Sequence, residues 1–252
     1  MNDRFDQAVL STACRHLPGL TVRAFPVCNS TNDLAKQWLL AGGEGCALFA
    51  AAAQTAGRGR CGRPFWSPDG SGVYFTVVRS GVSAPPVGLT CAAAVAVMRA
   101  IRTATGKQCD VKWVNDLLLG GRKVCGILCE AVTAGYVRGM VIGVGVNLRP
   151  AAFPPELAAV AGSLDDLSTP RADLVAEATR QLLPVLRDPA AVDWLDDYRA
   201  HSCVIGREIT FSRGGETVPA TAVGINEAGE LTVLTALGTE TLRTGEITLR
   251  LR

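Results

Sequence analysis

The 252-residue sequence lacks the signatures of several large classes of protein. No apolar run approaches the roughly 20 residues that a membrane-spanning helix needs, and residues 1–6 are polar and acidic, unlike a signal peptide. Low-complexity tracts are absent, and charged residues are only 19% of a chain that is 48% hydrophobic, which argues against disorder. We therefore expect a globular cytoplasmic protein with no membrane partner.

The residues of a zinc site or a disulfide framework are also scarce. The nine cysteines are an odd number without a CxxC pair, and the only histidines are His16 and His201. Cys125 and Cys129 lie four residues apart, a spacing that places both on one face of a strand, and buried cysteine behaves as a small hydrophobic residue. We expect these two thiols to lie in the core.

What the chain does contain is a regular succession of helices and strands. Periodicity predicts helices over residues 5–17, from a cap at Ser30 or Thr31, after Pro85-Pro86, and over residues 171–186. Residues 150–200 as a whole are expected to be helical. Strand composition is found over residues 21–27, 47–53, 72–78, 111–113, 116–119, 123–131 and 137–147.

The pattern changes near residue 203. Short alternating strands with glycine-bearing turns follow, predicted at residues 208–211, 218–225, 230–234 and 240–242. We predict an α+β protein with two domains. Residues 1–202 would form a mixed β-sheet flanked by helices, and residues 203–252 a small SH3-like β-barrel.

The densest polar feature is a loop in which glycines alternate with arginines, Gln54-Thr55-Ala56-Gly57-Arg58-Gly59-Arg60-Cys61-Gly62-Arg63. Glycine lets the backbone approach a ligand closely, and guanidinium groups suit phosphate and carboxylate oxygens. An exposed basic turn without a ligand is the alternative. Because GxxxxGK[ST] is absent, the loop is not a P-loop, and we expect it to meet an anionic ligand.

A second polar group surrounds a predicted hairpin, with Lys112-Trp113-Val114-Asn115-Asp116 before the Gly120-Gly121 turn and Lys123 through Leu128 after it. Asn115 and Asp116 would then lie beside Lys123 and Gly126. Asp116 could hold Mg²⁺ while the lysines neutralise phosphate oxygens. For Lys112 and Asp116 alone, an ordinary cross-strand ion pair is the competing interpretation.

Two weaker features complete the set. Gly143-Val144-Gly145-Val146-Asn147 ends an apolar strand, where glycines let a flat ligand lie on the backbone and an Asn amide can bond an adenine edge. Glycines at a strand end can equally mark a bulge. Ser30-Thr31-Asn32 has the composition of a helix N-cap, which can also direct its hydroxyls at a polar ligand.

In order, these segments and Trp66-Ser67 resemble the motifs of biotin–protein ligases. The match covers residues 22–200, and its most diagnostic part is the GRGRxGR loop. The tail ending in Thr244-Gly245-Glu246-Ile247 is similar to the family's small barrel. The resemblance implies a class II synthetase-like fold and a ligase, monomer or homodimer, that uses ATP and Mg²⁺ to make biotinyl-5′-AMP. Biotin would then pass to a lysine of a biotin carboxyl carrier domain of a carboxylase.

The resemblance also implies roles for individual residues. The biotin site would contain Ser30, Thr31, Asn32, Gln54, Gly57, Arg58, Arg60, Trp66, Lys123 and Gly126. ATP and Mg²⁺ would be held by Arg58, Arg60, Arg63, Asn115, Asp116 and Asn147, with Asp116 as the metal ligand. Catalysis would depend on Arg60, Lys123 and Lys112, because carboxylate attack on the α-phosphate brings two anions together.

The sequence departs from the family pattern in two places. Val114 stands where the family usually has proline, which restores a backbone N–H and loosens the turn, and Pro64-Phe65 precedes Trp66 in an altered loop exit. Too few residues precede the first motif for the winged-helix domain that some members carry, so we expect no DNA binding. Cys61 has no histidine near it in sequence, so we expect no covalent intermediate.

Two other functions stay open. A lipoate or octanoate ligase or transferase shares the acyl-to-lysine chemistry, although the GRGRxGR loop together with KW-x-ND favours biotin. A non-enzymatic nucleic-acid-binding module would use the arginine loop and the barrel. Against it, aromatic residues are only 6% of the chain, and glutamates offset the arginines of the barrel region.

Overall fold

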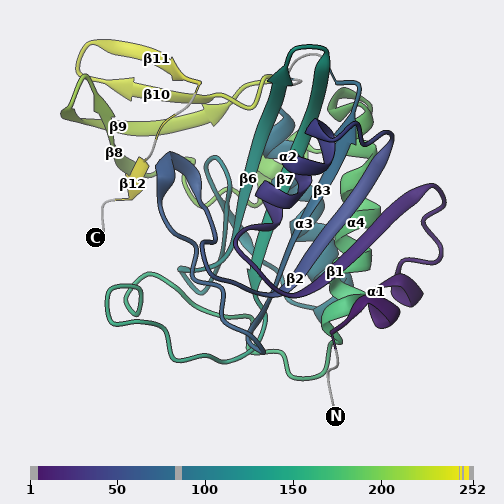
Figure 1. Ribbon diagram of the computed structural model, residues 1–252. Helices are drawn as coiled ribbons and strands as arrows, with labels where there is room; N and C mark the ends of the chain where they lie inside the picture. Colours follow the sequence, from purple (N-terminus) through teal and green to yellow (C-terminus); the bar gives the residue numbers. More distant parts are fainter. Residues whose placement is uncertain (1–4, 83–86, 244, 246, 250–252) are drawn as a thin grey trace.

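The computed structural model describes residues 5–82, 87–243, 245 and 247–249 (Figure 1). Pro85-Pro86, together with Thr244 and Glu246 of the predicted barrel end, lies outside the described residues. No helix in the described ranges is long and apolar enough to cross a membrane.

The larger unit is a seven-stranded sheet in the order β1-β2-β3-β7-β6-β5-β4, with β1 and β2 parallel and the other neighbours antiparallel. The seven predicted strands are confirmed apart from their exact ends. They are β1 (Leu20–Cys28), β2 (Cys46–Gln54), β3 (Gly72–Ser80), β4 (Asp110–Lys112), β5 (Asp116–Leu119), β6 (Arg122–Ala134) and β7 (Val137–Asn147).

Helices cover both faces of this sheet (Figure 1). The main core lies between one face and the helices α3 (Leu89–Thr105) and α4 (Arg171–Arg187). On the other face, α2 (Thr31–Leu40) covers a small apolar cluster that includes Phe49 and Val141. Because both faces are covered, β2, β3 and β7 are buried along almost their whole length, which explains their continuous apolar sequence.

The remaining helices are short: α1 (Gln7–Ala13), α5 (Leu195–Ala200) and 3₁₀ turns at Arg60–Gly62 and Pro189–Ala191. The predicted opening helix exists but is shorter than residues 5–17: it begins at Gln7, where the Asp6 carboxylate caps it by accepting from the Val9 N–H, and it ends at Ala13. The prediction of helix over residues 150–170 is wrong. Pro150, Pro154 and Pro155 interrupt it, because proline lacks the N–H that a helix interior needs.

The non-helical segment of residues 150–170 runs along the ends of two strands. Its backbone joins Lys123 in β6 through bonds with Val160 and Gly162 of 2.9 Å each, and the Leu164 N–H donates to the Asn147 carbonyl at 2.8 Å. The segment therefore forms a wall beside the ends of β6 and β7, where several predicted site residues lie.

The C-terminal unit is a five-stranded antiparallel sheet in the order β11-β10-β9-β8-β12. Its strands are β8 (Glu208–Arg213), β9 (Glu216–Ile225), β10 (Leu231–Thr235), β11 (Gly238–Leu242) and β12 (Ile247–Leu249). The first four were predicted, whereas β12 is too short to show a period. The Trp113 indole N–H donates to the Gly229 carbonyl at 3.0 Å and Arg199 donates to the Ile225 carbonyl, so this sheet is fixed against the larger unit. The α+β prediction is confirmed.

Candidate active site

The start of α2 is buried and polar. Ser30 is at the N-cap position, as predicted, but its hydroxyl makes no capping hydrogen bond. The Thr31 N–H, at the first position of the helix, donates to Gln54 Oε1 at the end of β2, at 2.9 Å. Ser30 is 2% exposed and Thr31 4%. A buried hydroxyl that is not used for capping can serve a ligand.

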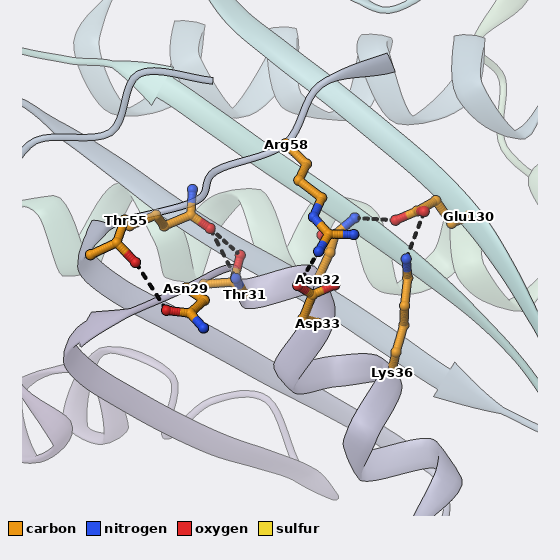
Figure 2. A network of polar contacts seen from close by, with 9 residues as sticks. Asn29, Thr31, Asn32, Asp33, Lys36, Thr55, Arg58 and Glu130 are labelled. Carbon is orange, nitrogen blue, oxygen red and sulfur yellow. Dashed lines mark hydrogen bonds and ion pairs between the residues drawn. The ribbon is translucent and has the colours of Figure 1, made fainter. Parts of the chain in front are cut away.

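A chain of polar contacts continues from Thr31 across the face of the sheet. Thr31 Oγ1 lies 2.9 Å from Thr76 Oγ1, and Thr76 Oγ1 lies 2.6 Å from Asn32 Oδ1. Asn32 Nδ2 donates to Glu130 at 2.8 Å, and Lys36 Nζ meets the same carboxylate at 2.6 Å (Figure 2). Three strands and one helix thus contribute to one network.

The other end of this network reaches the exit of the arginine loop. Gln54 Nε2 donates to Ser67 Oγ at 3.0 Å, and Ser67 Oγ donates to the Phe65 carbonyl at 2.9 Å. Gln54 also approaches Thr31 Oγ1 at 3.2 Å through its Oε1. The amide of Gln54 therefore connects the start of α2 to the loop.

Glycines make room above the sheet for these side chains. A β-carbon at Gly143 would lie 2.0 Å from Asn32 Oδ1, and one at Gly145 would lie 2.3 Å from the Phe65 ring. At Gly126 the Phe65 ring would be 3.1 Å away. The register of β3 and β7 runs through Gly143 and Gly145 without a shift, so the bulge interpretation is wrong. These glycines provide space on a regular strand.

The arginine loop lies over this face and is held from both sides. Arg58 forms an ion pair with Asp33 in the first turn of α2 at 2.9 Å (Figure 2), and Arg60 Nη1 donates to Asn115 Oδ1 at 3.3 Å. A β-carbon at Gly57 would meet the Phe65 carbonyl at 2.5 Å, which explains the glycine there. The loop is thus closed between α2 and the β4–β5 turn, while Arg63 stays exposed.

The β5–β6 hairpin brings together the residues that were predicted to meet. Asp116 lies opposite Gly126, and Lys123 Nζ is 2.7 Å from Asp116 Oδ1. Lys112 also lies opposite Asp116 in the β4–β5 register. The alternative ion pair between Lys112 and Asp116 is nevertheless wrong, because the partner of the carboxylate is Lys123. The Trp113–Val114 peptide bond that leads into this hairpin is cis.

The Asp116 carboxylate could hold Mg²⁺. Its Oδ1 atom is buried, and the contact with Lys123 is an ion pair that lacks hydrogen-bond geometry, so the oxygen keeps its acceptor capacity. Among the described residues no three His, Cys, Asp or Glu side chains form a metal cluster. Mg²⁺ commonly uses one or two carboxylates plus substrate phosphates and water, so a single carboxylate here fits a metal that arrives with a nucleotide.

Two predicted residues line the wall of residues 150–170. Asn147 Nδ2 donates to the Gly162 carbonyl at 2.9 Å, which leaves its amide oxygen and second proton for a ligand. The Trp66 ring packs against Phe153 with centroids 5.2 Å apart. Both side chains therefore lie toward this wall, on the side of the site away from Glu130.

The predicted core position is confirmed for Cys125, whereas Cys129 is partly buried. Cys125 is buried, and burial raises the pKa of the Cys129 thiol to about 12. Cys61 is exposed within the arginine loop, in a left-handed conformation with φ of 55°. A neutral, buried thiol is chemically inert, so Cys125 acts as a core residue, while the partly buried Cys129 packs against the core.

Sequence analysis missed four residues that hold the site: Asp33, Lys36, Thr76 and Glu130. Thr76 had a usable signal, because it is the single polar residue inside the apolar run of β3 and is 0% exposed. A fully buried threonine needs a hydrogen-bond partner. The other three are charged residues on the surfaces of elements, where sequence alone gives no reason to prefer them.

Comparison with known proteins covers most of the chain. Residues 24–147 match the biotin/lipoate A/B protein ligase family, and residues 204–250 match the biotin protein ligase C terminal domain. A Paracoccus denitrificans protein named biotin--[acetyl-CoA-carboxylase] ligase is 31% identical over 239 residues, covering 87% of this chain and 96% of that protein. Bifunctional ligase/repressor BirA of Bacillus subtilis (strain 168) is 40% identical over 131 residues, covering 50% of this chain.

The chain spans only 40% and 66% of the lengths of the BirA proteins of Bacillus subtilis and Bacillus spizizenii. Among solved structures, biotin protein ligase from Aquifex aeolicus in complex with biotin and ATP has a TM-score of 0.77 at 22% identity, covering 91% of this chain and 98% of that one. That likeness shows a shared fold. With the sequence match to the Paracoccus denitrificans protein along nearly its whole length, it follows that the chain belongs to the biotin/lipoate A/B protein ligase family.

Proposed function

We propose that the protein is an ATP-dependent biotin–protein ligase. It would activate biotin as biotinyl-5′-AMP and transfer biotin to a lysine of the biotin carboxyl carrier domain of a carboxylase. Several relatives carry the name of this activity, and a reaction that consumes ATP is expected in the cytoplasm.

The observation that carries this choice of acid is the buried polar floor at the start of α2. Ser30 has a hydroxyl that is not used for capping, and Thr31 and Gln54 present further polar atoms beside it. The ureido ring of biotin offers one carbonyl oxygen and two N–H groups to such a surface. The alkyl chain of octanoate and the dithiolane ring of lipoate offer none, so the buried Ser30 hydroxyl would gain no partner from them, at a cost of about 1–3 kcal/mol.

The charged side of the site suits the first step. Attack of the biotin carboxylate on the α-phosphate concentrates negative charge, and preorganised cations there lower the barrier. Arg60, at the Asn115 amide, and Lys123, beside Asp116, are the cations that we assign to the phosphate and carboxylate oxygens. Lys112, Arg58 and Arg63 would add positive charge at the edge, and Asn147 would bond the adenine.

Mg²⁺ would be held by Asp116 together with the nucleotide phosphates, and when bound it would offset charge on the phosphates. Gly126, Gly57 and Trp66 would shape the space around biotin, with Asn32 in the floor. We further propose that residues 1–202 form the catalytic domain and residues 203–252 a separate C-terminal domain, which the Trp113–Gly229 contact ties to the β4–β5 turn.

The test is ATP–pyrophosphate exchange by the purified protein with Mg²⁺, with biotin, lipoate or octanoate as the acid. Exchange that depends on biotin alone would support the proposal. Exchange only with lipoate or octanoate would move the protein to the other branch of its family, and no exchange with any acid would refute the adenylation step. Transfer of labelled biotin to a purified carrier domain then tests the second step.

A further inference from the structure

Glu130 ends the polar chain of the site and is outside every motif that the sequence suggested. An ionised carboxylate can only accept hydrogen bonds. Two donors meet it, the Lys36 ammonium at 2.6 Å and Asn32 Nδ2 at 2.8 Å (Figure 2). The amide of Asn32 must therefore turn its NH₂ group toward Glu130 and its oxygen toward Thr76.

The orientation of the Asn32 amide at Glu130 determines which atoms donate and which accept in the following hydrogen bonds. Thr76 Oγ1 is 2.6 Å from Asn32 Oδ1, and since an amide oxygen has no proton, Thr76 must donate its single proton there. Thr76 can then only accept from Thr31, whose Oγ1 is 2.9 Å away. If Thr31 donates to Thr76, its hydroxyl has no proton left for Gln54 Oε1 at 3.2 Å, so this oxygen accepts only from the Thr31 N–H at 2.9 Å and keeps a second acceptor position.

The chain is therefore one proton short. Three oxygen–oxygen contacts share the protons of only two hydroxyls, and the longest of the three, at 3.2 Å, is the one left without a proton. Thr76 is 0% exposed and Thr31 is 4% exposed, so both hydroxyls are shielded from solvent, whereas Gln54 is partly exposed. The shortage lies at Thr31 and Gln54.

We propose that Glu130 is a positioning residue that keeps this chain one proton short and directs the shortage to Thr31 and Gln54, so that the site demands an N–H donor from its ligand. The inference rests on the proposed function, because the donor would be an N–H group of the ureido ring of biotin. An acid whose far end lacks N–H groups cannot supply it.

The decisive variant is Glu130→Gln. Lys36 can only donate, so it will hold the oxygen of the new glutamine, whose NH₂ group then faces Asn32. The Asn32 amide turns over and donates to Thr76, which donates to Thr31, which donates to Gln54. Every contact now has a proton, and the ligand N–H loses an acceptor. We expect the Kd of biotin to rise about tenfold or more, with the Kd of ATP unchanged.

A rescue variant distinguishes a change in hydrogen-bond direction from damage to the structure of the site. Asn32→Asp alone places two carboxylates where the contact is 2.8 Å, and biotin binding should fall. In the double variant Glu130→Gln with Asn32→Asp, the introduced aspartate accepts from both the introduced glutamine amide and Thr76, which restores the original direction. Its Kd for biotin should return to within about threefold of the wild type, far from the product of the two single effects.

Lys36→Met is the matched control, because it removes the other donor to Glu130 and leaves the carboxylate in place. Biotin titration calorimetry on all five proteins decides the matter. Two results would overturn this inference alone. One is a Kd of biotin in Glu130→Gln equal to that of the wild type, and the other is a Kd in the double variant as high as the two single effects combined. A wild-type protein that binds no biotin would instead refute the proposed function and, with it, the ligand assigned here.

Discussion

The floor of the site and the arginine loop above it hold their polar groups by different means. The floor, formed by Thr31, Asn32 and Thr76, is buried, and its members bond to one another between one helix and one strand. The loop is held by an ion pair of Arg58, whose side chain is 55% exposed, and by a 3.3 Å contact of Arg60. Buried networks are rigid, whereas exposed ion pairs contribute about 0–1 kcal/mol.

This difference suits the two kinds of group that the proposed substrates present, the neutral ureido ring of biotin and the anionic carboxylate and phosphates. A neutral head group can be bound by a fixed set of donors and acceptors that never has to carry charge in a buried place. An anionic centre needs cations, and these are less costly to keep on a loop in contact with water until the ligand arrives. We expect damage to the floor to abolish recognition, and damage to the loop to slow the chemistry while recognition persists.

The largest effect should follow Gly143→Ala, which attacks the floor. Its β-carbon would lie 2.0 Å from Asn32 Oδ1, a contact that only a shift of the Asn32 amide can relieve. We expect the Kd of biotin to rise by on the order of a hundredfold or more, since the amide leaves both Thr76 and Glu130. Calorimetry measures it. Gly224→Ala in β9, where a β-carbon meets nothing within 4 Å, is the control, and equal behaviour of the two variants would contradict the assignment.

Arg60→Ala should have the next largest effect, and it should be on rate. Loss of one preorganised donor at the phosphate costs about 3 kcal/mol of barrier, on the order of a hundredfold in biotin-dependent exchange. The melting temperature should not change, because the hydrogen bond of Arg60 to Asn115 is long and weak, at 3.3 Å. Retention of biotinyl-adenylate equal to that of the wild type would contradict the role. Arg213→Ala, in the C-terminal sheet, controls for loss of one arginine.

The same contrast explains what could be predicted from the sequence. The strands that flank the site, β3 and β7, are continuous apolar runs, and the Gly143 and Asn147 motif lies on one of them. The arginine loop and the hairpin are each contained within a few residues, so their composition predicts their place. Local signals of this kind were enough to predict the sheet, the hairpin and the positively charged side chains of the site.

Long-range partners could not be predicted in this way. Asn32 lies 98 residues from Glu130 and 44 from Thr76 along the chain, and only the order of strands in the sheet brings them together. Nothing near Glu130 in sequence distinguishes it from a solvent-exposed glutamate. The failure at residues 150–170 has another cause, because the bonds of that segment go to Lys123 and Asn147 and replace those of a helix.

The reactivity of two thiols measures the difference between the exposed arginine loop and the interior on a smaller scale. Cys61 is exposed in the loop, whereas burial raises the pKa of Cys129, next to Glu130 in β6, to about 12. At pH near 8 we expect iodoacetamide to alkylate Cys61 at least about tenfold faster than Cys129, because the thiolate is the reactive form. Biotin with ATP should slow only the Cys61 reaction. Peptide mass spectrometry over time measures both rates, and ligand-independent labelling of Cys61 would show that the loop does not respond to ligand.

Asp33→Ala should have the smallest effect, and it tests how firmly the loop is held. The variant removes the partner of Arg58 at 2.9 Å and leaves the floor intact, because Asp33 takes no part in the contacts of Asn32, Thr76 and Glu130. An exposed ion pair contributes at most about 1 kcal/mol, so the Kd of biotin should rise by no more than about fivefold and the melting temperature should stay nearly constant.

Arg58→Ala should give the same result as Asp33→Ala, and the double variant should add nothing, since both substitutions remove the same interaction. The effect of Asp33→Ala should also shrink in high salt, which screens exposed pairs. A loss as large as that of Gly143→Ala would mean that the loop, and not the floor, decides whether biotin binds.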